Sequence, residues 1–181
     1  MEVIKYPIAG LIEFVPRTFA DDRGVFFETF SAGLMAEVGA DVAWVQDNQS
    51  VSKKGVLRGL HYQRPPHPQA KLVRVAQGRV LDVAVDLRRA SPTFGHHQLV
   101  ELSAELGNML FIPTGFAHGF MALEENTIFL YKCSDYYSPA AEGGLRWDDP
   151  ALCINWGQEV MPLVSPKDAV LPRLSEIESP F

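Results

Sequence analysis

The sequence predicts an all-β protein, a barrel or sandwich of short strands with a few short helices. Short apolar runs recur along the chain, and 14 glycines and 13 prolines are spread between them as turn signals. The 181 residues contain no linker, low-complexity tract or clear internal repeat. This length suits a sizeable core, so we expect residues 1–181 to form a single domain.

The net charge limits the classes of molecule that the protein can bind, and the cysteines indicate the cellular compartment. The formal net charge is −6 and the pI is about 5.3, which argues against nucleic acid as the main partner. A small anionic ligand needs only a few local cations and is compatible with this charge. Cys133 and Cys153 form no CxxC pair, so we expect free thiols in a reducing cytosol, with one disulfide as the alternative. No signal peptide or membrane-spanning stretch is visible, and a cytoplasmic protein is expected.

The first third of the chain is predicted to form strands around one helix. The expected elements are a strand at Gly10–Pro16, a polar loop at Arg17–Gly24, a strand at Val25–Phe30, a helix at Ser31–Val38 and a strand at Asp41–Ser52. Ser31 is the expected N-cap, and Gly39 follows the helix end. Glu28 shares a strand face with two aromatic residues, where it is either a site residue or a rim residue. The last strand has a polar face, either solvated or lining a cavity, made of Trp44, Gln46, Asn48 and Ser50.

Unusual polar residues occupy the segment 53–75, which we take as the centre of a site. Two strand-like runs flank a proline-rich bend there, at Gly55–Gln63 and Lys71–Ala76. Polar side chains stand where a plain β-core has Val or Ile, namely Arg58, His61, Gln63 and Lys71. A histidine in an apolar strand can act as a general base, and a nearby lysine can stabilise negative charge on a substrate oxygen. The alternative for His61 is an ordinary hydrogen-bonded core residue.

The alternation of side chains along a strand decides whether Arg58 and His61 can face the same cavity. Arg58 and His61 are three residues apart and would point to opposite faces of a regular strand. A bulge at Gly59, or an early end of the strand, would bring both side chains to one cavity.

The second half is predicted to continue as strands and turns. We expect a hairpin at Lys71–Leu87 around Gln77-Gly78, and a wrap of the barrel by Ser134–Phe181. A strand at Thr127–Cys133 would place three residues on one face, Phe129, Tyr131 and Cys133. His96 and His97 are expected to be exposed. Two buried-strand aspartates need partners, and we expect structural pairs between Asp82 or Asp86 and Arg74, Arg79 or Arg88.

One residue spacing is specific to a known barrel motif. The second cupin motif is matched by Gly107, Pro113, Gly115 and His118, and the opening of the first by Gly55 and His61. Gln63 stands where metal-binding cupins have their second histidine, and His67 or Pro68 where they have glutamate. The chain therefore looks like a cupin without its metal ligands. The alternative is a metal held by His61, His67 and His118.

Without a metal, these residues suit proton removal from a carbon next to a ketone. Such a proton is weakly acidic, and each unit of pKa mismatch costs about 1.4 kcal/mol. Lysine or histidine donors on the enolate oxygen lower that cost. Inversion of the carbon also requires an acid on the opposite side, for which Tyr131 is the candidate; its alternative is an ordinary core tyrosine.

Six sequence blocks occur in order along nearly the whole chain: GVLRGLHYQ, KLVRV, VAVDLRRASPTFG, IPTGFAHGF, YKCSDYYSP and RWDDP. Together they closely resemble the dTDP-4-dehydrorhamnose 3,5-epimerases, which have the cupin-type double-stranded β-helix, or jelly roll. The resemblance implies inversion of C3 and C5 of dTDP-4-dehydro-6-deoxy-D-glucose through enolates, in dTDP-L-rhamnose biosynthesis. It implies a dTDP-4-keto-6-deoxyhexose substrate and no metal or organic cofactor. It also implies a homodimer with strand exchange, in which Arg23 and Glu28 reach the neighbour's site.

The resemblance assigns a role to each candidate residue. His61 would be the base for C5 and C3, and Asp168 would orient it and raise its basicity. Lys71 would stabilise the enolate at O4, and Tyr131 would return a proton on the opposite face. The hexose would be positioned by Arg58 and His118. The nucleotide diphosphate, sugar or thymine would be contacted by Phe19, Arg23, Phe26, Glu28, Gln46, Asn48, Tyr137, Glu142 and Lys167.

Three other functions stay open at this point. An epimerase with the same base could invert only C3 or only C5 of a related dTDP-4-keto-deoxysugar. A cupin that binds sugar nucleotides without catalysis would bind dTDP but exchange no proton with solvent. A metal-dependent dioxygenase or isomerase would carry bound metal.

Overall fold

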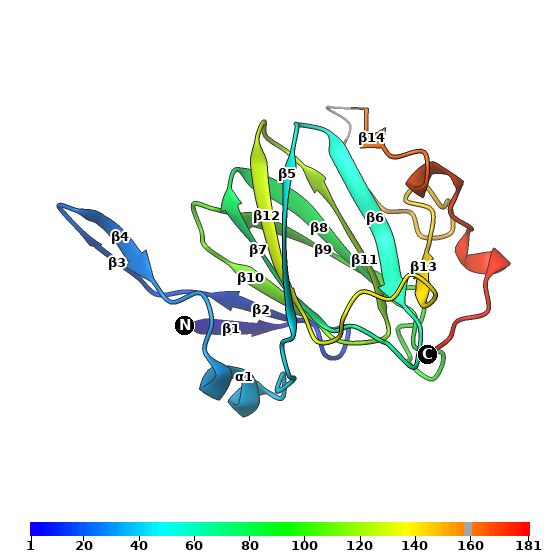
Figure 1. Ribbon diagram of the computed structural model, residues 1–181, viewed down its shortest axis with the longest axis horizontal. Coiled ribbons are helices and arrows are strands. Elements are labelled where there is room, and N and C mark those ends of the chain that lie inside the picture. The colour runs from blue at the N-terminus through cyan, green and yellow to red at the C-terminus, as the bar shows by residue number, and fades with distance from the viewer. Residues whose placement is uncertain (158–160) are drawn as a thin grey trace.

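The computed structural model describes residues 1–157 and 161–181, and most of it is two β-sheets that face each other (Figure 1). The first sheet has the order β1 (Glu2–Lys5), β2 (Ile12–Val15), β10 (Met109–Ile112), β7 (Lys71–Gln77), β12 (Thr127–Cys133) and β5 (Gln46–Ser52). The second has the order β13 (Glu142–Gly144), β6 (Val56–Gln63), β11 (Phe116–Ala122), β8 (Arg79–Asp86) and β9 (His97–Ser103), and β14 (Leu163–Val164) pairs with β6. The prediction of an all-β fold is confirmed.

The space between the sheets is filled with apolar side chains at one end. Strands β7, β10 and β12 contribute residues such as Val75, Leu110 and Phe129, and these meet Val80 and Phe120 of the second sheet. The rings of Phe120 and Phe129 stack with centroids 4.0 Å apart. This packing closes one end of the barrel, so the polar residues of the same strands gather toward the other end.

The outer faces of both sheets are covered by segments of different origin. Helix α1 (Ala32–Val38) packs Met35 against Phe14 and Phe111 of the first sheet. The C-terminal part, with the short 3₁₀ helices η1 (Asp168–Val170) and η2 (Leu174–Glu176), lies along the second sheet (Figure 1). The sequence predicts a wrap of the barrel by Ser134–Phe181, and from this segment Ser165, Lys167 and Asp168 line the cavity described below.

Local signals placed the helix correctly. The Ser31 side chain accepts a hydrogen bond from the backbone N–H of Leu34, and Gly39 ends the helix in the left-handed conformation. The following strand begins at Gln46 rather than Asp41. Trp44 packs edge-on against Phe111 under the sheet. The other members of its predicted face, Gln46, Asn48 and Ser50, line the cavities described below, so the interpretation of this face as a cavity wall is confirmed for these three residues. None of the described helices is long and apolar enough to cross a membrane.

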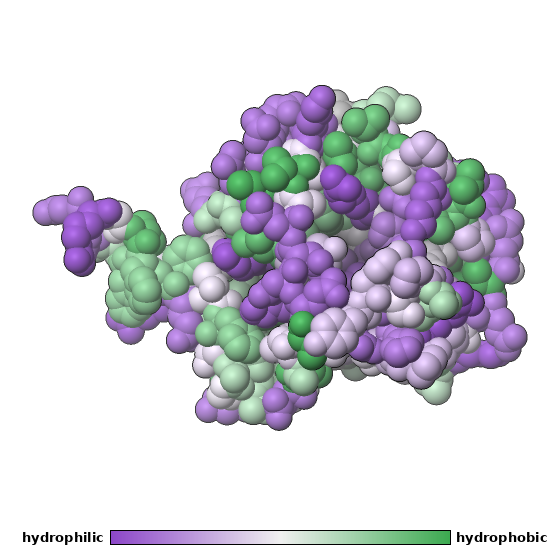
Figure 2. Space-filling view, viewed as in Figure 1, coloured by the Kyte–Doolittle hydropathy of each residue, from purple (hydrophilic) through white to green (hydrophobic). Residues whose placement is uncertain are grey.

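A two-stranded arm projects from the barrel where the sequence predicted a loop. Strands β3 (Thr18–Asp21) and β4 (Gly24–Phe27) pair with each other and extend away from both sheets (Figure 1). Only its tip has turn chemistry, so the prediction of a loop over Arg17–Gly24 is wrong. The second strand ends at Phe27, which leaves Glu28 outside it. Figure 2 shows the charged tip and the apolar surface behind it; Phe19 and Phe26 are 53% and 72% exposed.

The predicted hairpin at Lys71–Leu87 is wrong in its pairing although its turn is correctly placed. The chain turns at Gly78, which has a φ of 76°. Strand β7 belongs to the first sheet and β8 to the second, so the turn carries the chain from one sheet to the other. A Cβ on Gly78 would lie 2.6 Å from the hydroxyl oxygen of Thr127, so this crossing requires glycine.

Candidate active site

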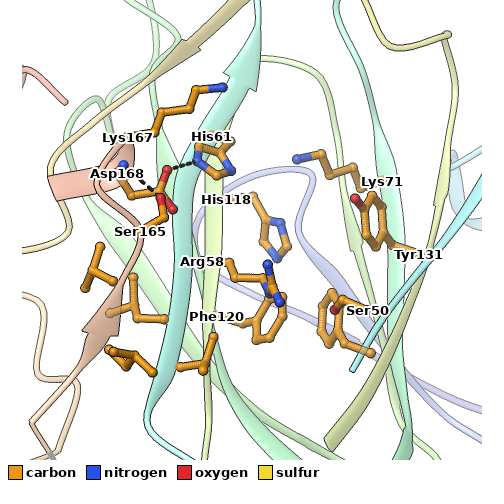
Figure 3. Close-up of a pocket in the computed structure, with 15 residues that line it drawn as sticks. Ser50, Arg58, His61, Lys71, His118, Phe120, Tyr131, Ser165, Lys167 and Asp168 are labelled. Atoms are coloured by element: carbon orange, nitrogen blue, oxygen red, sulfur yellow. Dashed lines mark hydrogen bonds and ion pairs between the residues drawn. The ribbon is translucent and has the colours of Figure 1, made fainter. Parts of the chain in front are cut away.

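A cavity of about 520 Å³ opens between the two sheets, and most of the predicted catalytic residues line it (Figure 3). Strands β6 and β11 supply Arg58, His61 and His118 on one wall. Strands β7 and β12 supply Lys71 and Tyr131 on the opposite wall. The C-terminal segment adds Ser165, Lys167 and Asp168 behind His61 (Figure 3).

A β-bulge brings Arg58 and His61 to the same cavity. His61 pairs with His118 of β11 while Arg58 pairs with Phe120, so three residue steps on β6 match two on β11. Gly59 sits inside this irregularity with a φ of 135°. A Cβ on Gly59 would lie 2.5 Å from the Cα of Gly119, which leaves no room for any other residue. The bulge expected at Gly59 is therefore confirmed.

His61 is held by a buried aspartate. Its Nε2 is 2.7 Å from Oδ1 of Asp168, whose side chain is only 6% exposed. The backbone N–H of Gly59 donates to the other carboxylate oxygen, and the N–H of Asp168 donates to Oγ of Ser165. Desolvation alone would raise the pKa of Asp168, but the hydrogen bonds and charge of His61 outweigh it and the pKa lies below its ordinary value. A carboxylate on Nε2 fixes this nitrogen as the N–H and leaves Nδ1 for proton transfer in the cavity.

His118 forms a second histidine–aspartate pair that the sequence did not predict. Its Nε2 lies 2.9 and 3.0 Å from the two carboxylate oxygens of Asp82, which is fully buried. The expectation that Asp82 pairs with an arginine is therefore wrong, because β8 points this side chain into the barrel. Arg79 instead binds Glu101 and Glu124 at the surface.

Asp86 does have the arginine partner that was expected. Arg88 donates two hydrogen bonds to it at 2.8 Å, and together with Ser91 and Thr93 lowers the pKa of this carboxyl to about 2 despite its desolvation. The expectation for the adjacent histidines holds in part. His96 is exposed, but His97 begins β9, and partial burial lowers the pKa of this imidazole.

Lys71 and Tyr131 face His61 from the other sheet (Figure 3). Burial lowers the pKa of Lys71, and the nearby Cys133, Asp82 and Glu142 oppose that shift. Burial also raises the pKa of Tyr131, so its phenol keeps its proton at neutral pH. The arrangement thus places a proton acceptor on one wall, and a proton donor and a cation on the other.

A second cavity of about 280 Å³ adjoins the first and shares His61, Lys71 and Tyr131 with it. It brings together four of the predicted binding residues, Gln46, Asn48, Tyr137 and Glu142. Lys167 and the Tyr137 hydroxyl both donate to the Glu142 carboxylate, at 2.6 and 2.9 Å. Desolvation would raise the pKa of Glu142, but these donors outweigh it and the pKa is lowered.

Four predicted binding residues do not reach either cavity of this chain. Three lie on the projecting arm and one directly after it: Phe19, Arg23, Phe26 and Glu28. Arg23 binds Asp21 at the arm tip, at 2.5 Å. A contact between these residues and a substrate in this chain's own cavity is therefore not supported.

The three histidines considered as metal ligands do not converge. His67 lies in the exposed bend after β6, with Nδ1 3.1 Å from Asp135. The Nε2 atoms of His61 and His118 face Asp168 and Asp82 instead. Across residues 1–157 and 161–181, no group of three or more His, Cys, Asp or Glu side chains is placed to hold a metal ion.

Sequence reasoning missed several lining residues. Ser165 supports Asp168 and lies three residues before it in a segment of poor periodicity. Phe120 and Phe129 form the apolar wall; Phe129 was placed on the strand face of Tyr131 but given no role in the site. Ser50 was placed on the correct strand face but given no role; alternation was the one available signal.

The fold and site match the class of sugar-nucleotide epimerases with a cupin-type barrel, and here a histidine–aspartate pair faces a tyrosine and a lysine across one cavity. Residues 5–176 match the dTDP-4-dehydrorhamnose 3,5-epimerase family, and the chain belongs to this family. The dTDP-4-dehydrorhamnose 3,5-epimerase of Salmonella typhimurium is 50% identical over 177 residues, which cover 97% of each chain.

Solved structures agree with this assignment and with the cupin-type fold. A dTDP-6-deoxy-D-glucose-3,5-epimerase from Legionella pneumophila, in complex with dTDP-4-keto-L-rhamnose, superimposes with a TM-score of 0.93 at 46% identity, covering 98% of this chain and 94% of its own. A 3'-monoepimerase from Streptomyces bikiniensis, in complex with dTDP-quinovose, gives a TM-score of 0.89 at 35% identity, covering 94% and 86%. The backbone alone therefore does not separate double from single epimerases.

Proposed function

We propose that this protein inverts both C3 and C5 of dTDP-4-dehydro-6-deoxy-D-glucose, as its 3,5-epimerase relatives are named to do. The observation that carries the proposal is the His61–Asp168 pair facing Tyr131 and Lys71 across one cavity. The higher identity to double epimerases than to the single epimerase favours inversion of both carbons.

The reaction follows from the placement of these groups. Nδ1 of His61 removes the proton from the carbon beside the C4 ketone, and the C–H electron pair moves to form the enolate. The Lys71 ammonium stabilises the negative charge that develops on O4. The Tyr131 hydroxyl returns a proton to the opposite face of the same carbon, which inverts it. The phenolate then regains a proton and the imidazolium loses one, so each inversion ends with no net loss of protons.

One base can serve both carbons because C3 and C5 flank the same carbonyl. Deprotonation at either position gives an enolate whose charge lies on O4, beside Lys71. A rotation or shift of the ring then presents the second carbon to the same pair of groups. Of the two histidines that line this cavity among the described residues, His61 is the more exposed, because His118 is buried against Asp82.

The second cavity suits the nucleotide diphosphate. It adjoins the proposed hexose site at His61, Lys71 and Tyr131, so a substrate can extend through both. Gln46 and Asn48 offer amide donors there, and Lys167 lies at the rim on Glu142. These local cations and amides attract an anion despite the net charge of −6.

A homodimer with strand exchange is the assembly that we propose. The β3–β4 arm carries exposed Phe19, Val25 and Phe26 away from its own barrel, and such a surface is typical of protein interfaces. Arg23 and Glu28 would then reach the neighbouring site. Light scattering after gel filtration should give twice the chain mass of 20.1 kDa. A monomer with full activity would contradict this proposal.

The two free cysteines support a reducing compartment, and we propose that the protein is located in the cytoplasm.

Incubation with dTDP-4-dehydro-6-deoxy-D-glucose in D2O tests the activity. Both inversions draw their new protons from groups that exchange with solvent, so deuterium should appear at both C3 and C5 in the product. Label at one carbon alone would identify a single epimerase. Tight dTDP binding without label would identify a binding protein, and metal analysis of the purified protein tests the metal-dependent alternative.

A further inference from the structure

The cavity face of the first sheet changes from polar to apolar in three rows. Cross-strand pairing aligns Lys71, Cys133 and Gln46 in the first row, and Val73, Tyr131 and Asn48 in the second. The third row consists of Val75, Phe129 and Ser50. Ser50 is therefore the polar member of a row that is otherwise apolar.

The polar residues on the same face of strand β5 as Ser50, namely Gln46, Asn48 and Ser52, all have hydrogen-bond partners. Gln46 donates to Asn48, and Asn48 donates to the Cys133 thiol. Ser52 accepts a hydrogen bond from Nε of Arg58. Among the described residues, Oγ of Ser50 is the one buried side-chain nitrogen or oxygen without any partner.

An unpartnered hydroxyl in this position calls for a ligand. Phe129 lies directly across from Ser50 and stacks on Phe120, so the protein wall offers the hydroxyl no acceptor. Ser50 lines the proposed hexose cavity with Arg58 and Tyr131 (Figure 3). Rotation about one side-chain torsion moves a serine oxygen between staggered positions, so Oγ can turn toward a bound sugar. A sugar hydroxyl can both donate to it and accept from it.

We propose that Ser50 is a specificity residue that hydrogen-bonds the C2 hydroxyl of the hexose. This inference rests on the proposed function. With C4 a ketone and C6 a methyl, the substrate ring has free hydroxyls only at C2 and C3. Inversion moves the C3 hydroxyl from one side of the ring to the other, whereas C2 keeps its configuration. A partner fixed on a strand therefore matches the C2 hydroxyl in both substrate and product.

A cycle of two enzymes and two substrates tests this contact. The enzymes are the wild type and Ser50→Ala, and the substrates are dTDP-4-dehydro-6-deoxy-D-glucose and its 2-deoxy counterpart. The readout is kcat/KM for deuterium incorporation from D2O. Gln49→Ala is the matched control, because Gln49 is the next residue of the same strand and its side chain is exposed on the other face.

If Ser50 contacts the C2 hydroxyl directly, the loss of kcat/KM caused by Ser50→Ala and the loss caused by removal of that hydroxyl are not additive. Ser50→Ala should lower kcat/KM about tenfold on the 2-hydroxy substrate, and the wild type should lose about the same on the 2-deoxy substrate. On the 2-deoxy substrate the wild type and Ser50→Ala should agree within about twofold, because the interaction is already gone. Gln49→Ala should behave as the wild type on both substrates.

Two results would overturn the inference. One is an equal loss on both substrates for Ser50→Ala, and the other is no loss on either. Thermal unfolding separates binding from a folding defect: Ser50→Ala should keep or raise Tm, since it removes an unpartnered buried hydroxyl. An inactive wild type on the 2-hydroxy substrate would instead refute the proposed function, so the two failures are distinguishable.

Discussion

His61 and His118 lie directly opposite each other on the adjacent strands β6 and β11, and Nε2 of each is hydrogen-bonded to its own aspartate. Their exposures separate their roles. The His61 side chain is 32% exposed to the cavity, whereas that of His118 is 7% exposed. Burial lowers the pKa of His118, which Asp82 only partly opposes, and so favours a neutral ring there. This difference in exposure supports the proposal that His61 transfers the proton and that His118 hydrogen-bonds the sugar.

Replacement of the proposed base should stop both exchanges. His61→Ala removes the one imidazole that faces the cavity beside Asp168, and general-base catalysis contributes about 10²–10⁴-fold. Deuterium incorporation at C3 and at C5 should both fall by at least this factor, measured by mass spectrometry of the product. The affinity for dTDP should stay near that of the wild type, since the second cavity keeps its amide and lysine groups.

His96→Ala is the matched control for this change, because His96 is exposed outside both cavities. It should keep wild-type exchange rates. Retention of most activity by His61→Ala would mean that another group is the base. Loss of dTDP binding together with activity would point to a disturbed fold rather than a missing base.

Replacement of the proposed acid should separate exchange from inversion. Tyr131→Phe keeps the ring in place but removes the proton donor of the wall opposite His61. The base can still remove a proton and return a deuteron to the same face, so some exchange should persist. Formation of the fully inverted product should fall by about 10²–10⁴-fold.

Tyr136→Phe controls for the loss of a phenolic hydroxyl, because Tyr136 is 65% exposed. Proton NMR of the product distinguishes retained from inverted configuration at each carbon. Equal losses of exchange and inversion in Tyr131→Phe would contradict its role as the opposite-face acid.

Much of the fold was predictable because its signals are local. The N-cap Ser31 and the following Gly39 define a helix through their own hydrogen bonds and backbone angles. Alternation along Thr127–Cys133 defines a strand and its inward face, and the structure gives the same bounds. The bulge at Gly59 was also predictable, since parity required an extra residue between Arg58 and His61.

The remaining features depend on which strands become neighbours. Strand β8 is buried along nearly its whole length, so its sequence carries no alternation that fixes a partner, and the pairing with β7 was predicted wrongly. Asp82 meets His118 because β8 and β11 are adjacent, a contact 36 residues apart in sequence. Proton chemistry at His61, Lys71 and Tyr131 was expected from their residue types, whereas the role of Asp168 and those of the binding residues came from resemblance to the family.

Gly59 should be the backbone position on which the site most depends. Gly59→Ala combines a φ of 135° with a Cβ placed 2.5 Å from the Cα of Gly119. The strain alone costs about 1–3 kcal/mol, and the overlap forces β6 and β11 apart. We expect a lower free energy of unfolding in urea, and a loss of exchange activity greater than the loss of folded protein, because His61 is displaced.

Gly24→Ala is a matched control for that substitution. Gly24 has a similar φ of 130°, but nothing lies within 4 Å of its added Cβ. Gly24→Ala should lower the free energy of unfolding by the backbone strain alone, about 1–3 kcal/mol, and should not displace His61. Equal activity per folded molecule in the two variants would mean that the bulge does not position His61.

Lys71 should set opposite pH trends for stability and for activity. Burial lowers its pKa below the ordinary 10.5, so between the folded and unfolded pKa values the unfolded chain binds more protons. The Lys71 contribution to the free energy of unfolding should therefore rise with pH across this window, up to 10.5. Activity should fall over the same range, because the neutral amine no longer stabilises the enolate oxygen. Urea unfolding of the wild type and of Lys71→Met at several pH values tests the trend in stability. The difference between their free energies of unfolding gives the contribution of Lys71 at each pH. Lys71→Arg keeps a positive charge, so its remaining activity should lack the alkaline decline, whereas an unchanged decline would assign it to another group.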